Sequence, residues 1–142
     1  MPTITRDGIN LAYDERGTGS PAFVFIHGWT CDRSFFAPQA DYFAKRHKVV
    51  SVDLRGHGES DKPQGAYPIS AYADDIAHLT DKLQLGRVVA VGHSMGGKIA
   101  TLLASRAVPP TISTERRGGR RAATSARRAS SAEAKRASRS SA

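Results

Sequence analysis

The stretch that most constrains the fold is residues 88–107, where the apolar run VVAV passes through Gly92-His93-Ser94-Met95-Gly96 into an amphipathic segment. A short Val-rich run is typical of a strand, and the segment behind it places Met95 and Ile99 on one helical face. A chain that turns directly from strand to helix holds its central residue in a strained backbone conformation, and side chains two positions away would crowd the turn. The sequence therefore predicts a tight strand–serine–helix turn that lifts Ser94 into solvent, with Gly92 and Gly96 as its small flanking residues.

Two further apolar runs precede this turn, AFVFI at residues 22–26 and VVSV at residues 49–52. Like residues 88–91, they show no polar alternation, which is typical of strands buried on both faces of a parallel sheet. Near the N-terminus, Asp7-Gly8 stands between short alternating segments and predicts a hairpin.

Helical patterns lie between these runs. In residues 70–85 the apolar side chains recur at steps of three and four, with Ser70 as the expected N-cap and Gly86 just past the end; the face consists of Tyr72, Ile76, Leu79 and Leu83. Residues 35–48 place Phe36, Ala40, Phe43 and His47 on one face, and Pro38 is tolerated in the first turn. Strands that alternate with helices after an opening hairpin predict an α/β fold with a mostly parallel sheet and flanking helices.

Motifs follow the first two apolar runs as well. His27-Gly28-Trp29 ends the first run, and DLRGHGES at residues 53–60 follows the second. With the G-x-S-x-G turn, these motifs occur in the order and spacing of an α/β-hydrolase, and residues 1 to about 106 resemble the N-terminal half of that fold. The three motifs together are specific to the superfamily, but they do not choose among its members.

The resemblance implies roles for particular positions. Ser94 is the expected nucleophile, and the backbone N–H groups of Met95 and Trp29 are the expected oxyanion donors, with no metal and no cofactor. A serine at this position indicates a small-molecule substrate with an ester, a lactone or another acyl group, and is not typical of dehalogenases or epoxide hydrolases. The loop at residues 53–60 is expected to be structural, so Arg55 and His57 are interpreted as scaffold residues.

The sequence departs from the family in its catalytic triad, which normally runs Ser, then Asp or Glu, then His. After Ser94 there is no Asp and no His, and the acids are Glu115 and Glu133. Neighbouring residues of a strand point to opposite faces, so His93 is expected to face away from the serine. His27 or His57 could in principle substitute as the base, but we expect a chain that is close to inactive.

The charge divides the chain into two regions. Residues 1–107 hold 12 Lys and Arg against 11 Asp and Glu, whereas residues 108–142 hold nine against two and carry nearly all of the net charge of +8. The first region is the predicted partial hydrolase domain; the second is rich in Arg, Ala and Ser, and we expect it to be disordered because it has almost no large apolar side chains. Because the excess charge belongs to this tail alone, nucleic acid is not expected to be the main partner.

Three interpretations of the tail remain. A truncated or frame-shifted hydrolase would show such a composition, because Arg, Ala, Ser, Gly and Pro have GC-rich codons. The tail could instead be a basic arm that makes the chain a non-catalytic binding module for polyanions by neutralising phosphates. A kinase site at Arg127-Arg128-Ala129-Ser130 is the third interpretation.

Location and self-association complete these expectations. Cys31 is the single cysteine, and no export signal or membrane span is evident, so we expect a cytoplasmic protein without a membrane partner. In the family fold, later strands cover the run at residues 88–91. Here that edge is expected to be open, which favours self-association.

Overall fold

The computed structural model describes residues 1–107. Five strands and three α-helices follow one another with a short 3₁₀ helix, in the order β1 (Thr3–Arg6), β2 (Ile9–Arg16), β3 (Ala22–Ile26), η1 (Arg33–Phe36), α1 (Ala37–Phe43), β4 (Val49–Val52), α2 (Ile69–Lys82), β5 (Val88–Gly92) and α3 (Met95–Ala107). The predicted α/β class is confirmed. The boundary expected after residue 107 stays a prediction, because the whole of the predicted tail at 108–142 lies outside the described residues.

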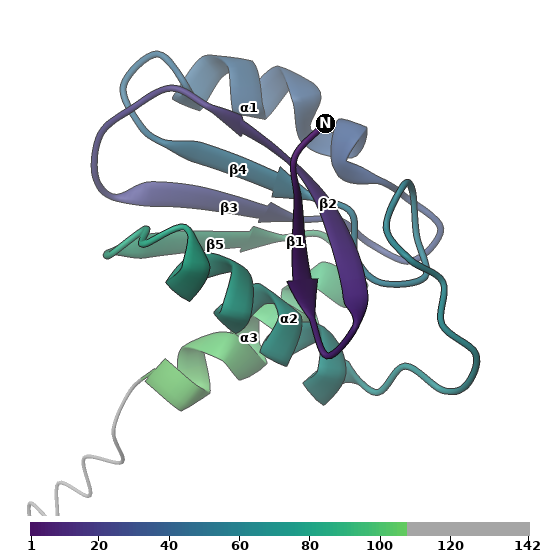
Figure 1. Ribbon diagram of the computed structural model, residues 1–142. Helices are drawn as coiled ribbons and strands as arrows, with labels where there is room; N and C mark the ends of the chain where they lie inside the picture. Colours follow the sequence, from purple (N-terminus) through teal and green to yellow (C-terminus); the bar gives the residue numbers. More distant parts are fainter. Residues whose placement is uncertain (108–142) are drawn as a thin grey trace, which may run out of the picture. The chain divides into compact units, whose positions relative to one another are not determined.

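The sheet has the strand order β1-β2-β4-β3-β5 (Figure 1). β3 pairs in parallel with both β4 and β5, whereas β1, β2 and β4 are joined by antiparallel pairing. The predicted hairpin joins β1 to β2: Asp7 and Gly8 have φ values of 50° and 76°, as a turn with two left-handed residues requires. The parallel strands bring their carboxyl ends, and the motifs that follow them, to one edge of the sheet.

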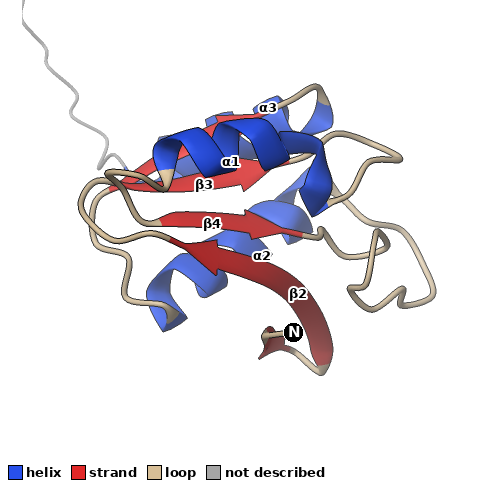
Figure 2. Cartoon of the chain, turned by 90° about the horizontal axis from the view of Figure 1, so that it is seen from above, coloured by secondary structure: helices blue, strands red, loops and turns tan. Residues whose placement is uncertain are grey.

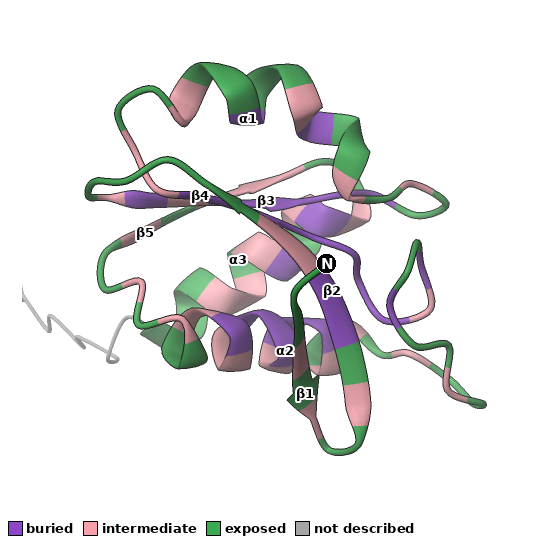
Figure 3. Ribbon diagram, turned by 45° about the horizontal axis from the view of Figure 1, so that its top comes forward, coloured by how far each residue is buried: buried purple, intermediate pink, exposed green. Residues whose placement is uncertain are grey.

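Helices cover both faces of the sheet. α1 lies on one face, and α2 and α3 lie on the other (Figures 1 and 2). Side chains of β3 alternate between the two faces of the sheet: Phe25 packs toward α1, whereas Val24 and Ile26 pack toward α2 and α3. Figure 3 shows the buried residues of α2 turned to the sheet.

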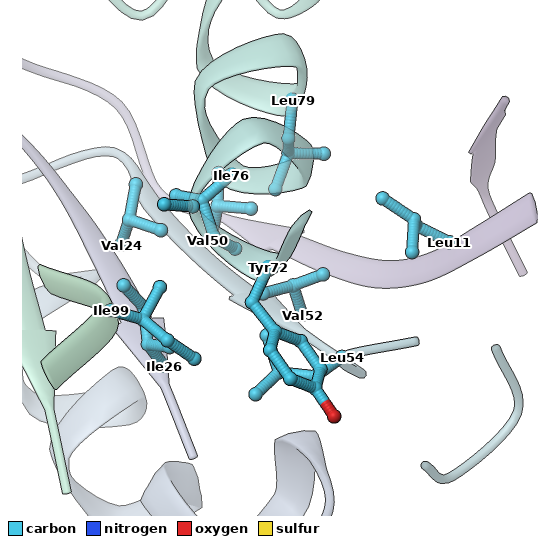
Figure 4. Packing of buried hydrophobic residues seen from close by; sticks show 11 residues of the cluster. Leu11, Val24, Ile26, Val50, Val52, Leu54, Tyr72, Ile76, Leu79 and Ile99 are labelled. Carbon is cyan, nitrogen blue, oxygen red and sulfur yellow. The ribbon is translucent and has the colours of Figure 1, made fainter. Parts of the chain in front are cut away.

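The larger core lies between α2 and the sheet (Figure 4). Tyr72, Ile76 and Leu79, predicted from their spacing, are each almost fully buried there. The Tyr72 hydroxyl has no hydrogen-bond partner among residues 1–107, and burial raises the pKa of this phenol. The predicted face of α2 is therefore the face that holds it to the sheet.

The ends of α2 differ from the sequence expectation. Pro68, not Ser70, is the N-cap, and Ser70 lies inside the first turn. At the other end Gln84, not Gly86, takes the first left-handed position, with φ 51°. The N–H of Leu85 then donates to the carbonyl of Thr80 over 3.1 Å, which is a Schellman ending. Asn and Gly are the usual residues there, so a glutamine gave no signal in the sequence.

Two other expectations need correction. The segment at residues 35–48 is not one helix: η1 precedes α1, and His47 lies beyond the end of α1 although its ring still packs 4.9 Å from that of Phe23. β5 is not buried on both faces, since Val89 remains 38% exposed. Within residues 1–107, β5 is the edge strand next to β3, so it pairs with another strand on one side only. In the described part of the chain, no helix combines the length and the hydrophobicity needed to cross a membrane.

Candidate active site

The turn between β5 and α3 has the predicted geometry. Ser94 is exposed and adopts φ 53°, a left-handed conformation that costs a non-glycine residue about 1–2 kcal/mol. The N–H of His93 donates to the carbonyl of Ile26 over 3.1 Å, which anchors the turn to the end of β3. The N–H of Gly97 donates to the carbonyl of Ser94 over 3.0 Å and begins the helix. The surrounding structure thus holds a strained serine at the surface.

The two flanking glycines are required by close backbone contacts. A Cβ at Gly92 would collide with the backbone carbonyl of Gly96 and lie 2.5 Å from the nitrogen of Gly97. A Cβ at Gly96 would collide with the carbonyl oxygen of Ile26 and lie 2.7 Å from that of His27. The obstacles are backbone atoms, which cannot swing aside as side chains can. Glycine at both positions lets α3 begin directly against the end of β3.

The loop after β3 lies against this turn. A Cβ on Gly28 would lie 2.9 Å from Nδ1 of His93 and 3.3 Å from Cβ of Ser94. Thr30, with φ 62°, bends the chain immediately afterwards. Trp29 is 60% exposed, and its ring lies 5.1 Å from that of His57 in an edge-to-face arrangement. The structure therefore brings the loop of Trp29 beside Ser94, although the two residues are 65 positions apart in sequence.

Two backbone donors at this junction are free. Within residues 1–107 the N–H groups of Trp29 and Met95 have no protein acceptor, whereas the N–H of Gly96 donates to the carbonyl of His93 over 2.8 Å. Met95 is the first residue of α3, so its N–H also lies at the positive end of the helix dipole. Free donors beside an exposed hydroxyl can receive negative charge that develops on a substrate oxygen.

His27 is engaged by the scaffold through both ring nitrogens. Nε2 accepts the N–H of Leu54 over 3.0 Å, so the proton is on Nδ1, which donates to the carbonyl of Gly28 over 2.7 Å. Burial lowers the pKa of His27 and keeps the ring neutral. With neither nitrogen free, His27 cannot accept a proton from Ser94. Its ring instead ties the loops after β3 and β4 together.

The other imidazoles have contacts of their own within the described residues. Nδ1 of His57 donates to the carbonyl of Arg55 over 3.0 Å. His47 contacts the carbonyl of Pro21, and His78 contacts that of Thr5. His93 stacks on Phe35 with 4.5 Å between ring centres. In the described part of the chain, no histidine hydrogen-bonds to Ser94.

The loop after β4 is built around the buried carboxylate of Asp53. It accepts the N–H of Arg33 over 2.6 Å and that of Glu59 over 2.9 Å, and it pairs with the Arg33 guanidinium. Arg33 also pairs with Asp14 and Glu59, so one side chain connects β2 with the loops after β3 and β4. No pattern in the sequence indicates this cluster, because its members are far apart along the chain.

Arg55 has a structural role as well. Its guanidinium makes two bonds to Asp75 in α2, with Nε–Oδ2 at 2.5 Å and Nη2–Oδ1 at 2.6 Å, and both side chains are largely buried. Arg6 adds a third contact to Asp75 at 3.1 Å. The interpretation of Arg55 and His57 as scaffold residues agrees with these contacts.

Comparison with known proteins identifies the family. Residues 21–114 match the protein family described as alpha/beta hydrolase fold. The chain belongs to the α/β-hydrolase family. The resemblance carried by the three sequence motifs is therefore confirmed.

Individual α/β-hydrolases with similar sequences or structures cover the same region. The chain is 40% identical over 98 residues to 2-(acetamidomethylene)succinate hydrolase from Mesorhizobium japonicum, covering 69% of this chain and 35% of that protein. The crystal structure of the enol-lactonase from Burkholderia xenovorans superposes with a TM-score of 0.70 at 34% identity, over 74% of this chain and 42% of the lactonase. A mutant epoxide hydrolase from Bacillus megaterium gives a TM-score of 0.69 at 31% identity, over 74% of this chain and 37% of that enzyme. The chain thus spans well under half the length of these α/β-hydrolases.

Proposed function

We propose that this chain carries the nucleophile and the oxyanion hole of a serine hydrolase that acts on a carboxylic ester or a related acyl bond of a small molecule. The observation that carries the proposal is the junction of the loop after β3 with the turn after β5. There an exposed Ser94 in a left-handed conformation stands beside the free N–H groups of Trp29 and Met95. The membership of the chain in the α/β-hydrolase family supports a hydrolase. The choice of esters and lactones as substrates follows from the chemistry of a serine nucleophile.

In the proposed reaction, the Ser94 hydroxyl attacks the carbonyl carbon and its proton passes to a base. The two amides stabilise the negative carbonyl oxygen of the tetrahedral intermediate. The intermediate collapses to an acyl-serine ester as the protonated leaving group departs, and water then hydrolyses this ester. Neither step calls for a metal or a cofactor.

A serine nucleophile favours acyl substrates over epoxides. Opening an epoxide with a serine would form an ether, which has no carbonyl for water to attack, so the enzyme could not be regenerated in the same way. An acyl-serine keeps its carbonyl next to the oxyanion donors, and the second half-reaction can reuse them. The likeness to an epoxide hydrolase is therefore a likeness of fold, and Ser94 directs the proposal to acyl transfer.

The proposal includes low activity for the chain as it stands. No histidine in residues 1–107 hydrogen-bonds to Ser94, and the sequence after Ser94 contains neither His nor Asp. Loss of the base of a serine hydrolase costs on the order of a million-fold in kcat. We expect slow reaction of Ser94 with activated reagents and negligible turnover of ordinary esters.

Labelling with a fluorophosphonate tests the proposal. We expect slow labelling that maps to Ser94, is lost in Ser94→Ala, and persists in Ser105→Ala, a matched exposed serine in α3. Added imidazole should accelerate the labelling of Ser94, because it can replace the absent base. Equal labelling of Ser94→Ala and the wild type would contradict the nucleophile assignment, and rapid labelling without imidazole would contradict the expected low activity.

A further inference from the structure

The charges of the folded region are separated between its two ends. Three connections at the amino-terminal ends of β3, β4 and β5 make up what we call the basic end, namely residues 15–21, 41–48 and 81–87. The basic end holds six Lys and Arg against three Asp and Glu, a net charge of +3. The remainder of residues 1–107 holds six against eight, a net charge of −2. The folded region has a net charge of only +1 because the positive charge of the basic end is largely balanced by negative charge elsewhere.

Backbone hydrogen bonds bring the three connections together. The N–H of Phe23 donates to the carbonyl of Lys48 over 2.8 Å, and the N–H of Ala22 donates to that of Arg87 over 2.9 Å. The N–H of Lys48 donates to the carbonyl of Gly19 over 3.2 Å. In Figure 1 these connections gather at the left end of the sheet, opposite the carboxyl ends of β3 and β4. The basic end thus lies apart from the site around Ser94.

Several cations of the basic end are free to bind a ligand. Four exposed basic side chains of the basic end have no carboxylate of residues 1–107 within 4 Å: Lys45, Arg46, Lys82 and Arg87. By contrast, Arg16 pairs with Asp41 and Lys48 pairs with Glu15. The free cations are therefore available to neutralise negative charges of a partner.

An exposed aromatic ring lies beside two of these cations, Lys45 and Arg46. Tyr42 is 67% exposed, and Nζ of Lys45 lies 5.7 Å from its ring centre. The ring lines a cavity of about 300 Å³ together with Phe43, Lys45, Arg46 and His47. Free cations beside an exposed aromatic ring are the combination that binds single-stranded nucleic acid, in which phosphates meet the charges and a base stacks on the ring.

The described part of the chain ends near the basic end. Ala107, the last described residue, lines a groove with Gly86 and Val88 at the start of β5. From there the sequence continues into residues 108–142, with nine Lys and Arg against two Glu. The described part of the chain thus ends close to the connection that holds Arg87, and the sequence that follows has a net charge of the same sign as the basic end.

We propose that the basic end binds single-stranded nucleic acid, with Lys45, Arg46 and Arg87 on phosphates and Tyr42 stacked on a base. Such contacts read charge and stacking rather than sequence, so binding is sequence-tolerant and falls steeply with salt. Tyr42 presents one ring among charged side chains, which suits a base better than it suits the apolar interior of a lipid bilayer. The activity is independent of Ser94.

Fluorescence anisotropy of the full chain with a labelled oligothymidylate of about 20 nucleotides tests the proposal over a range of salt concentrations. The double variant Lys45→Gln/Arg46→Gln is compared with Lys62→Gln/Lys98→Gln, which has the same net charge but changes exposed lysines outside the basic end. For single strands, each phosphate contact contributes about −0.7 to the slope of log K against log salt concentration. The slope should therefore become less steep by about 1.4 in the first variant and should hardly change in the second. Equal losses in both variants, or no binding by the wild type, would overturn the proposal.

Tyr42 gives an independent readout. Tyr42→Ala should weaken binding about fivefold or more, whereas Tyr42→Phe keeps the ring and should bind like the wild type. Equal affinities for Ala and Phe would overturn the stacking contact. Vesicles that contain phosphatidylserine serve as the competing anionic surface. If Lys45→Gln/Arg46→Gln loses vesicle binding but keeps oligonucleotide binding, the surface binds membranes and the proposal is wrong. Arg87→Gln provides a second test if the double variant does not fold by circular dichroism.

Discussion

Gly96→Ala is the substitution whose outcome the structure defines most sharply. The new methyl group would collide with the carbonyl oxygen of Ile26 and lie 2.8 Å from its carbonyl carbon. Both atoms belong to the end of β3, the strand that pairs with β4 on one side and β5 on the other. Because β3 is held on both sides, relief requires the first turn of α3 to move away from the sheet.

The magnitude follows from two opposing effects. Overpacking of a tight site costs about 1–3 kcal/mol and sometimes more, and contact with fixed backbone puts Gly96 at the upper end of that range. Alanine gains about 1 kcal/mol over glycine in a helix. We therefore expect a net loss of about 2 kcal/mol, which lowers Tm by roughly 8–16 °C in a domain of this size.

Gly97→Ala is the matched control one residue later. A Cβ there would lie 3.6 Å from the carbonyl oxygen of Gly92, an ordinary van der Waals distance. Only the gain in helix propensity then remains, so Gly97→Ala should be as stable as the wild type or slightly more stable. Thermal unfolding followed by circular dichroism measures both variants. If both substitutions change Tm equally, the steric argument for Gly96 is refuted.

Four further predictions concern stability and assembly. Ser94→Gly should be about 1 kcal/mol more stable than Ser94→Ala in urea unfolding, because glycine removes the left-handed strain; equal stabilities would contradict this. Asp75→Ala should cost about 3–5 kcal/mol because it leaves a largely buried arginine unpaired, whereas the more exposed Asp74→Ala should cost about 1 kcal/mol or less. The pKa of His27 is lowered in the folded state, so below pH 6.5 the unfolded chain binds more protons and stability falls with falling pH; His27→Gln should weaken this dependence in urea titrations at pH 7.5 and pH 5.5. The outer edge of β5 should cause self-association that Val89→Lys reduces in gel filtration, and a sharp monomer peak of the wild type at high concentration would argue against it.

The candidate site was predictable where its geometry is local. The glycines around Ser94 and the strand and helix beside it are neighbours in sequence, so sterics within a few residues predict the turn. The family resemblance pointed to Trp29, but the contact of Gly28 with His93 and Ser94 that brings its loop to the serine is a contact between distant segments. The burial of Val89 in β5 was predicted wrongly, because an apolar run indicates that a strand can be buried and does not indicate which of its side chains other elements cover.

Histidine roles show the same limit. Considered as a residue at a strand end, His27 could be a base as well as a scaffold residue. Two hydrogen bonds identify it as a scaffold residue: the N–H of Leu54 donates to Nε2, and Nδ1 donates to the carbonyl of Gly28. Leu54 is 27 positions away, and no pattern around His27 reveals that contact.

The sequence by itself determined the hairpin at Asp7-Gly8, the apolar runs that became strands and the turn at Ser94. Each depends on backbone sterics or on side-chain periodicity within a few residues, and such preferences hold before the chain is compact. Only the tertiary structure decided which histidine ring nitrogens are hydrogen-bonded to the scaffold. It also decided that Arg33 pairs with Asp14, Asp53 and Glu59, and that a folded region of net charge +1 has a basic end. Hydrogen bonds, ion pairs and surface charge depend on distances in space, and folding brings together residues whose separation in sequence carries no information about those distances.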